Sequence, residues 1–434
     1  MGGKRAGRSI AALSAARRTG RRLRPTSLSG VALVVQKFGG TSVADADRIK
    51  AVADHIARTK RSGDNVIVVV SAMGKTTDDL LHLANQVSKV IPGREMDMLW
   101  TAGERISMAL VCMALAERGV AAASFTGSQA GIITDDLHTR ARIIEVKGDR
   151  IREALAAGSV PVVAGFQGVS TTRDVTTLGR GGSDTTAVAL AAALGADRCE
   201  IYTDVSGVFS ADPRIVPSAR KLPRLSFEEM LEIAATGARV LALRSVEFAR
   251  NHHVTLLVRS SFTWEPGTLI TEEDPDMEQP VVSAVTSDTS SAKITLSGVT
   301  DRPGIAARLF RGLADRSVNV DMIVQNISHD GTTDISFTVP KDDVGASLEA
   351  AEAMRPSLGA VSVIADEDVA QVSLVGAGMK THPGVTALMF ETLAASDINI
   401  EMISTSPIRI SCMVRADVAE RAVQALHAAF ELSA

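Results

Sequence analysis

Residues 176–194 read TTLGRGGSDTTAVALAAAL, and this stretch decides the fold. It predicts the end of a strand, a glycine-rich loop and an alanine-rich helix that ends at Gly195. Gly179, Gly181 and Gly182 allow the backbone of the loop to approach a ligand more closely than bulkier residues would permit. The stretch therefore predicts a tight strand-to-helix turn that is suited to holding a ligand.

The start of the predicted helix has the features of an anion-binding site. Ser183 and Asp184 stand where an N-cap is expected, ahead of a run of strong helix formers. Free backbone N–H groups and the positive end of the helix dipole would face the loop. The planar guanidinium of Arg180 suits a carboxylate or a phosphate. A tight turn without a ligand is the alternative.

Length and composition indicate a soluble globular protein of two or three domains. The chain has 434 residues, of which 45% are hydrophobic and 22% are charged. Aromatic residues make up only 3% and the net charge is −4, which argues against nucleic acid as a partner. No apolar run reaches about 18 residues, so no membrane span is expected. Cys112, Cys199 and Cys412 lie far apart in apolar runs, which predicts reduced thiols in a cytoplasmic protein and no metal-binding motif.

Residues 1–30 differ from the rest of the chain, because they contain eight basic residues and no acidic one. Such a segment is similar to an organellar transit peptide. The alternatives are a disordered tail and an extension upstream of a true start at Val31, since valine can be encoded by an alternative bacterial start codon. We favour these alternatives and exclude the segment from the predicted fold.

Beyond residue 30, short apolar runs alternate with helical patterns. The apolar runs are residues 32–35, 66–70, 160–164 and 199–202. Helical periodicity follows the first run and returns at 101–118, where Ile106, Leu110 and Met113 share one stripe. Strands that alternate with helices predict a mostly parallel sheet covered on both faces, with ligands bound beyond the carboxyl ends of the strands.

Four polar residues come directly after predicted strands and should converge on one edge of the sheet: Lys37, Ser71, Arg180 and Asp204. Lys37 precedes Gly39 and Gly40, and a lysine in such a turn can reach a transferred phosphate while glycine amides hold neighbouring oxygens. For so short a motif alone, a solvated loop lysine is the more common outcome. Residues 74–76, GKT, are not a Walker A loop, because Val69 stands where that motif requires glycine.

An internal repeat occupies the C-terminal part of the chain. The sequence ITLSGVTDRPGIAARLFRGLADRSVNVDMIVQNIS, from Ile294, recurs from Val372 as VSLVGAGMKTHPGVTALMFETLAASDINIEMISTS. Four residues recur 80 positions later: Pro303, Gly304, Phe310 and Asn319. Each copy predicts a strand, a Pro-Gly turn, a helix, an Asn-containing turn and a strand. The open N–H groups at each helix entry suit a carboxylate, although a repeat that only dimerises is the alternative.

Six motifs together resemble the aspartokinases of the amino-acid kinase family. They are KFGGTS at 37–42, SAMGKTTD at 71–78, TAGERIS at 101–107, FTGSQAG at 125–131, TLGRGGSDTT at 177–186 and YTDVSGVFSADPR at 202–214. The C-terminal repeat is similar to a pair of ACT domains, which bind amino-acid effectors. Other amino-acid kinases share the nucleotide-binding half, but these motifs and the tandem repeat occur together in aspartokinases.

The resemblance implies an α/β fold with three parts. A three-layer kinase domain with a mostly parallel sheet spans residues 31–270, and an acidic, proline-containing linker spans 271–285. Two α+β ACT domains of βαββαβ order follow at 286–365 and 366–434.

The implied reaction is phosphorylation of the β-carboxylate of L-aspartate by ATP with Mg²⁺, giving 4-phospho-L-aspartate for lysine, threonine, methionine and diaminopimelate synthesis. A carboxylate is already a nucleophile at neutral pH, so the protein must align two anions and stabilise the charge that develops. No protein ligand for the metal is predicted.

By the same resemblance, Lys37 stabilises that charge, and Glu104 and Asp184 lie near the substrate ammonium or orient Lys37. A helix cap at Asp184 is compatible with such a role, whereas the alternative for Glu104 is an exposed helix carboxylate. The implied substrate-binding residues are Thr77, Glu104, Arg180, Gly181, Gly182 and Ser183, with Arg180 on the α-carboxylate of aspartate.

The implied ATP-binding residues are Lys37, Phe38, Gly39, Gly40, Ser71, Thr203, Asp204, Phe209, Ser210, Ala211, Asp212, Pro213, Arg214 and Arg239. Those from 203 to 214 would line the adenine and ribose site, while Tyr202 is more simply a core residue. Arg239 stands where relatives often carry lysine, and arginine keeps the charge but not the point geometry of lysine.

Lysine, threonine or both are the implied effectors, acting through an oligomer or an α2β2-type assembly that associates through the ACT domains. The implied effector residues are Asp301, Arg302, Pro303, Gly304, Ile305, Ala306, Asn319, Val320, Asp321 and Gln325 in the first copy, and His382, Val385, Thr386, Asn399 and Ile400 in the second. The second copy has Glu401 where the first has Asp321, so the two sites need not bind alike. Met277 is placed where some relatives start a separate regulatory subunit.

Two other functions compete with this one. The chain could be another amino-acid or carbamate-type kinase, against which Arg180, Glu104 and the repeat argue. It could also be a catalytically silent amino-acid sensor, which would be free to lose Lys37, Glu104 and Asp184.

Overall fold

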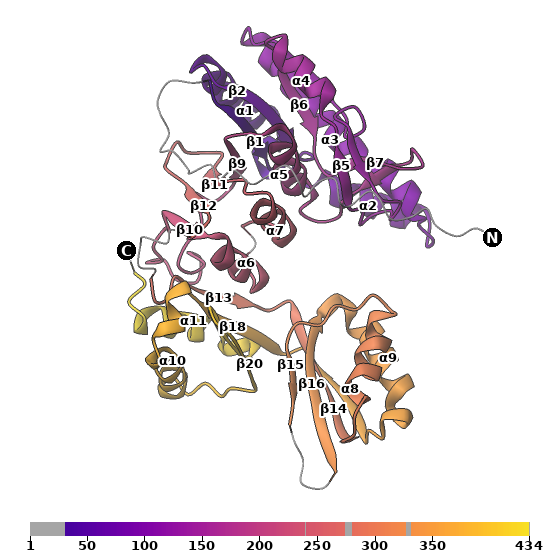
Figure 1. Ribbon diagram of the computed structural model, residues 1–434, viewed down its shortest axis with the longest axis vertical. Coiled ribbons are helices and arrows are strands. Elements are labelled where there is room, and N and C mark those ends of the chain that lie inside the picture. The colour runs from indigo at the N-terminus through magenta and orange to yellow at the C-terminus, as the bar shows by residue number, and fades with distance from the viewer. Residues whose placement is uncertain (1–30, 239, 274–279, 327–330, 434) are drawn as a thin grey trace, which may run out of the picture.

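The computed structural model describes residues 31–238, 240–273, 280–326 and 331–433. The basic segment 1–30, Arg239 and Met277 lie outside the described residues, and so do the predictions made for them. The chain forms an N-terminal domain, residues 31–271, and two smaller repeat modules that lie below it in Figure 1.

An eight-stranded sheet forms the centre of the N-terminal domain. Its order is β10 (Arg224–Ser226), β12 (Thr268–Thr271), β11 (Leu256–Ser260), β9 (Arg198–Thr203), β1 (Leu33–Phe38), β2 (Asn65–Val70), β6 (Val160–Ala164) and β3 (Ala122–Phe125). The strands from β11 to β3 are parallel, and β12 runs antiparallel to β11. The prediction of a mostly parallel sheet is therefore confirmed.

Helices cover both faces of this sheet. Helices α1 (Ala46–Arg61) and α3 (Gly93–Glu117) pack on one face, and α4 (Asp149–Ala156), α5 (Gly182–Leu194), α6 (Phe227–Ala235) and α7 (Leu243–Asn251) pack on the other. Strand β2 shows why the strand run is continuously apolar, because Val66, Val68 and Val70 face α1 and α3 while Ile67 and Val69 face the opposite layer. The domain thus has the predicted three layers.

Helix α3 begins earlier and buries a different face from the one predicted. Ile106 is 50% exposed and Met113 is 66% exposed, whereas Glu104, Met108 and Val111 are buried. The apolar stripe predicted on this helix was wrong because its buried face includes polar side chains, which a search for apolar periodicity passes over. Although α3 is long and apolar enough to cross a membrane, it packs against β2, β3 and β6.

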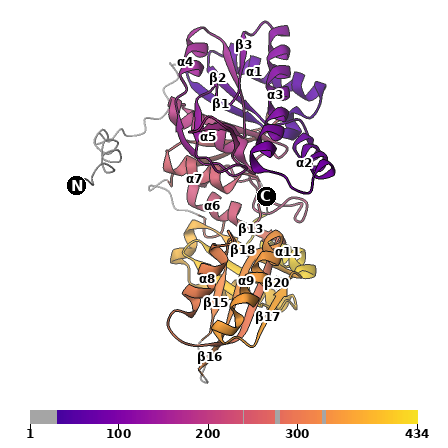
Figure 2. The same cartoon turned by 90° about the vertical axis from the view of Figure 1, so that its right-hand side faces the viewer.

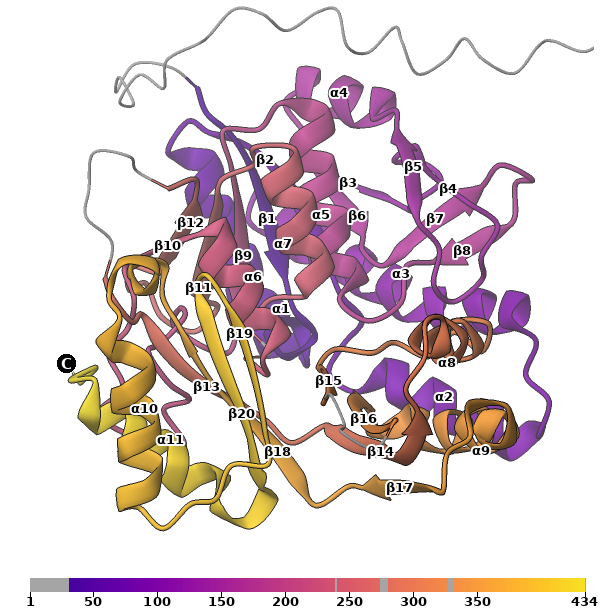
Figure 3. The same cartoon turned by 60° about the horizontal axis from the view of Figure 1, so that its bottom comes forward.

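A small second sheet lies beside the N-terminal end of α5. It has the order β5 (Ile143–Val146), β4 (Ile132–Thr134), β7 (Gln167–Ser170) and β8 (Val175–Thr177), and it projects to one side in Figure 3. Strand β8 also packs against α3. Because β8 ends at Thr177, this sheet delivers the glycine-rich loop to the edge of the central sheet. Helix α2 (Thr76–Val87) packs on α3 at the same edge.

The first repeat module, residues 291–366, has the predicted βαββαβ order. Its elements are β14 (Ser291–Thr300), α8 (Ile305–Ala314), β15 (Ile323–Gln325), β16 (Thr332–Pro340), α9 (Val344–Leu358) and β17 (Ser362–Asp366). The sheet order is β15-β16-β14-β17, and all pairs are antiparallel.

The second repeat module comprises residues 284–288 and 369–433. Its elements are β13 (Ala284–Asp288), β18 (Val369–Val375), α10 (Gly384–Ala395), β19 (Met402–Ser406), β20 (Arg409–Arg415) and α11 (Ala419–Ala429). Strand β13 pairs with β18 across the whole of the first repeat module. The predicted boundary at residue 286 therefore falls inside a strand, and the first module is an insertion in the second.

The second repeat module lies against the N-terminal domain, and the first lies to its side (Figures 1 and 2). The hydrophobic core of the second repeat module includes Ala211, Val216 and Ala219 of the N-terminal domain. The two repeat modules meet through Met322, beside β15, and Met402 and Met413 of the second module. The predicted linker thus connects parts that share packed surfaces.

Candidate active site

Lys37 and Asp184 form a buried ion pair at the carboxyl ends of the central strands. Lys37 lies near the end of β1, and Asp184 lies in the first turn of α5. Lys37 Nζ is 2.6 Å from Asp184 Oδ1, and each side chain is 11% exposed. This carboxylate oxygen has no aligned hydrogen bond, so charge attraction holds the ammonium in place. Of the two predicted acidic residues, Asp184 is the one that contacts Lys37.

The glycine turn after Lys37 packs closely against the turn after β2. Gly39 N donates a hydrogen bond of 3.2 Å to Tyr202 O. A Cβ atom on Gly40 would lie only 3.0 Å from Ala72 O, so the two turns touch through their backbones. The Gly39 N–H is therefore paired in this structure, and the binding of phosphate by the Gly39 amide stays a prediction.

Glu104 reaches the same region from α3. Its Oε1 accepts a hydrogen bond of 3.3 Å from Ala72 N, and its buried Oε2 has no partner among the described residues. Burial raises the pKa of Glu104 to about 7, although two backbone hydrogen bonds oppose this shift. The alternative of an exposed helix carboxylate is wrong, since Glu104 is 3% exposed. A buried carboxylate oxygen with unused bonding capacity is suited to an incoming cation.

The glycine-rich loop enters α5 earlier than the sequence predicts. The N-cap is Gly181, with a left-handed φ of 71°, and Ser183 and Asp184 lie inside the first turn. A Cβ atom on Gly181 would overlap that of Ala242, so the position requires glycine. The predicted N-cap at Ser183 or Asp184 is therefore wrong, and the carboxylate is free to contact Lys37. Gly195 ends the helix as predicted.

The remaining predicted substrate residues line the same edge. Arg180 is exposed beside the loop and has no ion pair among the described residues. Thr77 is half-buried in the first turn of α2. Ser183 is buried against Gly165, and a Cβ atom there would lie 2.7 Å from Ser183 Oγ. The loop therefore carries an exposed guanidinium without an ion pair among the described residues, four residues before Asp184.

Asp97 is a supporting residue that sequence reasoning missed. It is fully buried, accepts hydrogen bonds from Thr177 Oγ1 at 2.5 Å and Thr139 N at 3.0 Å, and contacts His138 Nδ1 at 2.7 Å. Because Thr177 is the last residue of β8, these contacts fix the start of the glycine-rich loop. The sequence feature that could have indicated Asp97 is its position two helical turns before Glu104, which places both residues on the same face of α3.

A second buried network stabilises β1 and β9. Tyr202 Oη donates to Glu200 Oε2 at 2.7 Å and contacts His55 Nε2 at 2.6 Å. The Phe38 ring stacks on Tyr202 with centroids 4.8 Å apart. Burial lowers the pKa of His55 to about 4, so this histidine is neutral at neutral pH. Phe38 and Tyr202 are thus core residues, as expected for Tyr202, and the predicted contact of Phe38 with ATP would have to come from its backbone.

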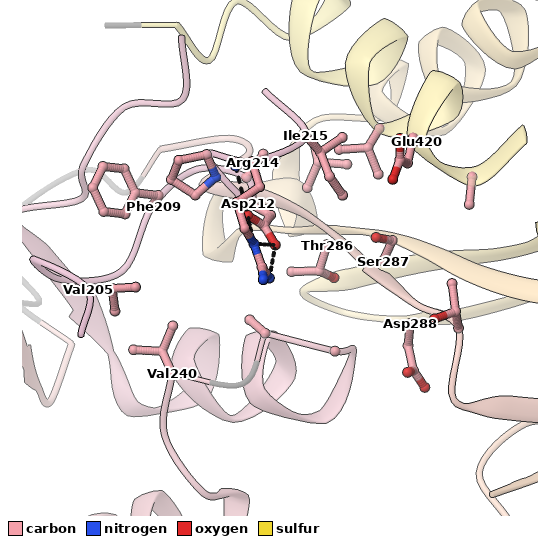
Figure 4. Close-up of a pocket in the computed structure, with 18 of the residues that line it drawn as sticks. Val205, Phe209, Asp212, Arg214, Ile215, Val240, Thr286, Ser287, Asp288 and Glu420 are labelled. Carbon is pink, nitrogen blue, oxygen red and sulfur yellow. Dashed lines mark hydrogen bonds and ion pairs between the residues drawn. The ribbon is translucent and has the colours of Figure 1, made fainter. Parts of the chain in front are cut away.

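A cavity of about 950 Å³ lies beyond β9, between the N-terminal domain and the second repeat module (Figure 4). Seven predicted ATP-binding residues line it: Thr203, Asp204, Phe209, Ala211, Asp212, Pro213 and Arg214. The Arg214 guanidinium is 2.6 Å from the Asp212 carboxylate and lowers the pKa of that acid. Ser210 does not line the cavity, since it is fully buried. The volume is that of a site for a small organic ligand.

Comparison with known proteins decides the family. Residues 32–260 match the amino acid kinase family, and residues 294–354 and 372–430 each match an ACT domain. The aspartokinase of Corynebacterium efficiens is 57% identical to this chain, over 93% of this chain and 97% of that protein. This chain belongs to the aspartokinases. It is an aspartate kinase with C-terminal ACT domains, as its motifs predict.

Solved aspartokinases also share the fold. The structure of E. coli aspartokinase III in complex with aspartate and ADP has a TM-score of 0.80 at 26% identity and covers 92% of this chain and 99% of that one. The same enzyme in complex with lysine and aspartate has a TM-score of 0.72 at 27% identity, with 91% and 99% covered.

The predicted effector residues of this aspartokinase do not come together within one module. Asp301 N donates to Gly331 O at one end of β16, whereas Asp321 N donates to Thr338 O near the other end. Strand β16 separates these contacts by roughly 20 Å. The residues around the Pro303 turn and those around Asn319 are therefore at opposite ends of the first repeat module.

The second copy is arranged in the same way and differs in its acidic residue. Glu401 forms an ion pair with Lys293 of the first repeat module and lies 3.3 Å from Arg415. Asp321 is exposed, and its carboxylate has no ion pair among the described residues. The two acidic positions thus differ in their partners: Glu401 forms an ion pair between the modules, whereas Asp321 is exposed.

Proposed function

We propose that this aspartate kinase transfers the γ-phosphoryl group of ATP to the β-carboxylate of L-aspartate and releases 4-phospho-L-aspartate. One observation carries the proposal. The buried Lys37–Asp184 pair and the Oε2 atom of Glu104, which has no partner among the described residues, flank one glycine turn at the carboxyl edge of the sheet. This arrangement offers a fixed positive charge for a phosphoryl group and a negative charge for an ammonium group.

The chemical step needs charge stabilisation rather than a base. The β-carboxylate attacks the γ-phosphorus, the bond to the bridging oxygen of ADP breaks, and no proton is transferred. Lys37, held by Asp184, stabilises the charge on the oxygens in transit. The described residues contain no group of three His, Cys, Asp or Glu side chains that could hold a metal ion. Mg²⁺ in this proposal is held by the ATP phosphates, whose charge it neutralises.

Glu104 and the glycine-rich loop orient the amino acid. Glu104 pairs with the ammonium group of aspartate, and the exposed Arg180 pairs with its α-carboxylate, with Thr77 and Ser183 as hydrogen-bonding neighbours. The β-carboxylate is then directed toward Lys37. The adenosine part of ATP occupies the cavity beyond β9, where Thr203 ends a strand that pairs with β1 and Asp204 follows it.

The first test is the choice of acceptor. Hydroxylamine traps the acyl phosphate as a hydroxamate, so turnover with ATP, Mg²⁺ and aspartate is measured beside the same mixture with glutamate. We expect turnover with aspartate and about 10- to 100-fold lower kcat/KM with glutamate, because one extra methylene displaces the carboxylate from Lys37. Equal turnover of the two acids would refute the proposed site.

We further propose feedback inhibition by lysine, threonine or both, which places this enzyme at the start of the synthesis of these amino acids. The E. coli enzyme was solved with lysine bound, which supports lysine as an effector. Because the effector residues lie at opposite ends of one module, a complete site needs residues from two modules. Association of two chains through the ACT domains would supply them.

A further inference from the structure

Residues 209–219 both line the candidate nucleotide cavity and pack into the core of the second repeat module. Phe209, Asp212 and Arg214 face the cavity, across from Thr286 of β13 and Glu420 of α11 (Figure 4). Ala211, Val216 and Ala219 from the same segment belong to the hydrophobic core that α10 and α11 form on their sheet. A shift of α11 must therefore move one wall of the cavity.

Ser210 fixes this segment to the module from within. Its Oγ contacts His427 Nε2 at 2.9 Å and Leu432 O at 3.1 Å, and it accepts a hydrogen bond from Arg220 N at 2.9 Å. A hydroxyl has one proton, and only Leu432 O is an obligatory acceptor. The arrangement is satisfied when Ser210 donates to that carbonyl and the His427 Nε2–H group donates to Ser210. The backbone of Ser210 is held by the same module, since Val285 N of β13 donates to Ser210 O at 2.7 Å.

Other contacts between the N-terminal domain and the repeats go to the same module. Glu229 accepts from Ala377 N at 3.4 Å, Glu232 pairs with Arg409 at 3.1 Å, and Gln424 Nε2 donates to Ile215 O at 2.9 Å. Among the hydrogen bonds and ion pairs seen in the described part of the chain, none joins residues 31–271 to residues 291–366. In the described residues, the polar contacts that reach the N-terminal domain thus come from the second repeat module and not from the first.

We propose that His427 is a positioning residue for ATP: from α11 of the second repeat module, it holds residues 209–214 in the conformation that binds nucleotide. This inference rests on the proposed nucleotide site. Because His427 is 1% exposed and lies behind Ser210, it contacts no substrate itself. The second repeat module, rather than the first, then sets the affinity of the enzyme for ATP.

The test compares four variants of the full chain. His427→Leu removes the bond to Ser210, whereas His427→Gln keeps an amide donor near the position of Nε2. Gln424→Ala removes the exposed bond to Ile215 and carries little risk of misfolding. Arg421→Ala is the matched control, since Arg421 is exposed on the same helix and its bond goes to Asp397 O within the module. Steady-state kinetics for both substrates and the Kd for Mg·ADP are measured on each.

We expect His427→Leu to raise the KM for ATP and the Kd for Mg·ADP about three- to tenfold, and Gln424→Ala to raise both about twofold. The KM for aspartate and kcat should stay within about twofold of wild type, and His427→Gln and Arg421→Ala should match it. A folded His427→Leu with an unchanged nucleotide Kd would overturn the inference. So would an equal loss in every parameter, which a merely structural role produces.

Failure of the proposed function is a separate outcome. If the wild type bound Mg·ADP but gave no aspartate-dependent turnover, the assigned reaction would be wrong, and the nucleotide Kd values would still decide the role of His427. If His427→Leu did not fold, an unchanged Kd in Gln424→Ala would overturn the inference. If the wild type bound no nucleotide, both proposals would fail.

Discussion

Glu104 shows how a single residue is shaped for a ligand at a cost in stability. The Oε2 atom is buried and has no partner among the described residues, and burial raises its pKa to about 7. A bound ammonium group would reverse this shift by favouring the charged carboxylate. The free enzyme therefore holds a carboxylate in an unfavourable environment that aspartate relieves, which is typical of a binding site.

The raised pKa of Glu104 predicts the pH dependence of stability. Between its ordinary value of 4.5 and about 7, the folded state binds more protons at Glu104 than the unfolded state. The free energy of unfolding that this group contributes therefore falls as pH rises through that window. We expect Glu104→Gln to be more stable than wild type by about 1–3 kcal/mol at pH 8 without substrate.

Urea unfolding at pH 8 and at pH 4.5 measures this difference, which should shrink at the lower pH because wild-type Glu104 is then protonated in the folded state and about half protonated in the unfolded state. The same variant should lose affinity for aspartate and retain affinity for Mg·ADP. A Glu104→Gln protein that is less stable than wild type at pH 8 would contradict the claim that the buried Glu104 carboxylate destabilises the enzyme when no ligand is bound.

At the residue scale the sequence predicted identities better than contacts. Lys37, Glu104 and Asp184 were singled out, but the sequence left open which acid meets Lys37, because that choice depends on how α3 and α5 approach β1. Gly39 was expected to bind phosphate, yet its N–H pairs with Tyr202 O. Asp97 and Glu200 were missed, since neither belongs to a glycine-rich motif and their roles arise only through tertiary contacts.

At the scale of elements, the entry to α5 depends on backbone conformation rather than on a side-chain cap. Gly181 takes a positive φ at the N-cap, packed against Ala242. Polar residues after a loop normally suggest a cap, so the sequence placed the helix start at Ser183 or Asp184. The positive φ of a glycine is not visible in the sequence. Its consequence is that Asp184 faces Lys37.

We expect Gly181→Ala to lower the free energy of unfolding by about 2–4 kcal/mol and to weaken aspartate binding, because the new Cβ atom adds overlap with Ala242 to the strain of a positive φ. Gly195→Ala is the matched control. Its φ is 68° and its surroundings are open, so it should cost only about 1 kcal/mol and leave kinetics unchanged. Thermal unfolding and the KM for aspartate distinguish the two, and equal effects would argue against a packed loop.

At the scale of the whole molecule, β13 determines how the parts are connected. The repeat was recognisable in sequence, but the pairing of β13 with β18 spans the entire first repeat module, and no local pattern encodes such a pairing. The prediction therefore placed a linker and a domain boundary where a strand of the second module lies. This strand brings the second repeat module against the cavity.

Regulation should depend on Asp321 and not on catalytic groups. Its carboxylate is exposed, in contrast to Glu401, which is paired with Lys293. We expect Asp321→Ala to keep its kcat and KM values but to lose at least about tenfold in sensitivity to lysine or threonine, since one charged contact to an effector ammonium is removed. Inhibition curves with each amino acid and with both together measure this, and unchanged inhibition would refute the effector site.

The role of Lys37 is the centre of this account, and the rate of hydroxamate formation from aspartate and ATP tests it most directly. Lys37→Ala is compared with Lys75→Ala, which removes the exposed lysine of the GKT sequence. We predict that folded Lys37→Ala loses about 10²- to 10³-fold in kcat, while Lys75→Ala keeps its activity. Near-normal turnover by Lys37→Ala would contradict the mechanism.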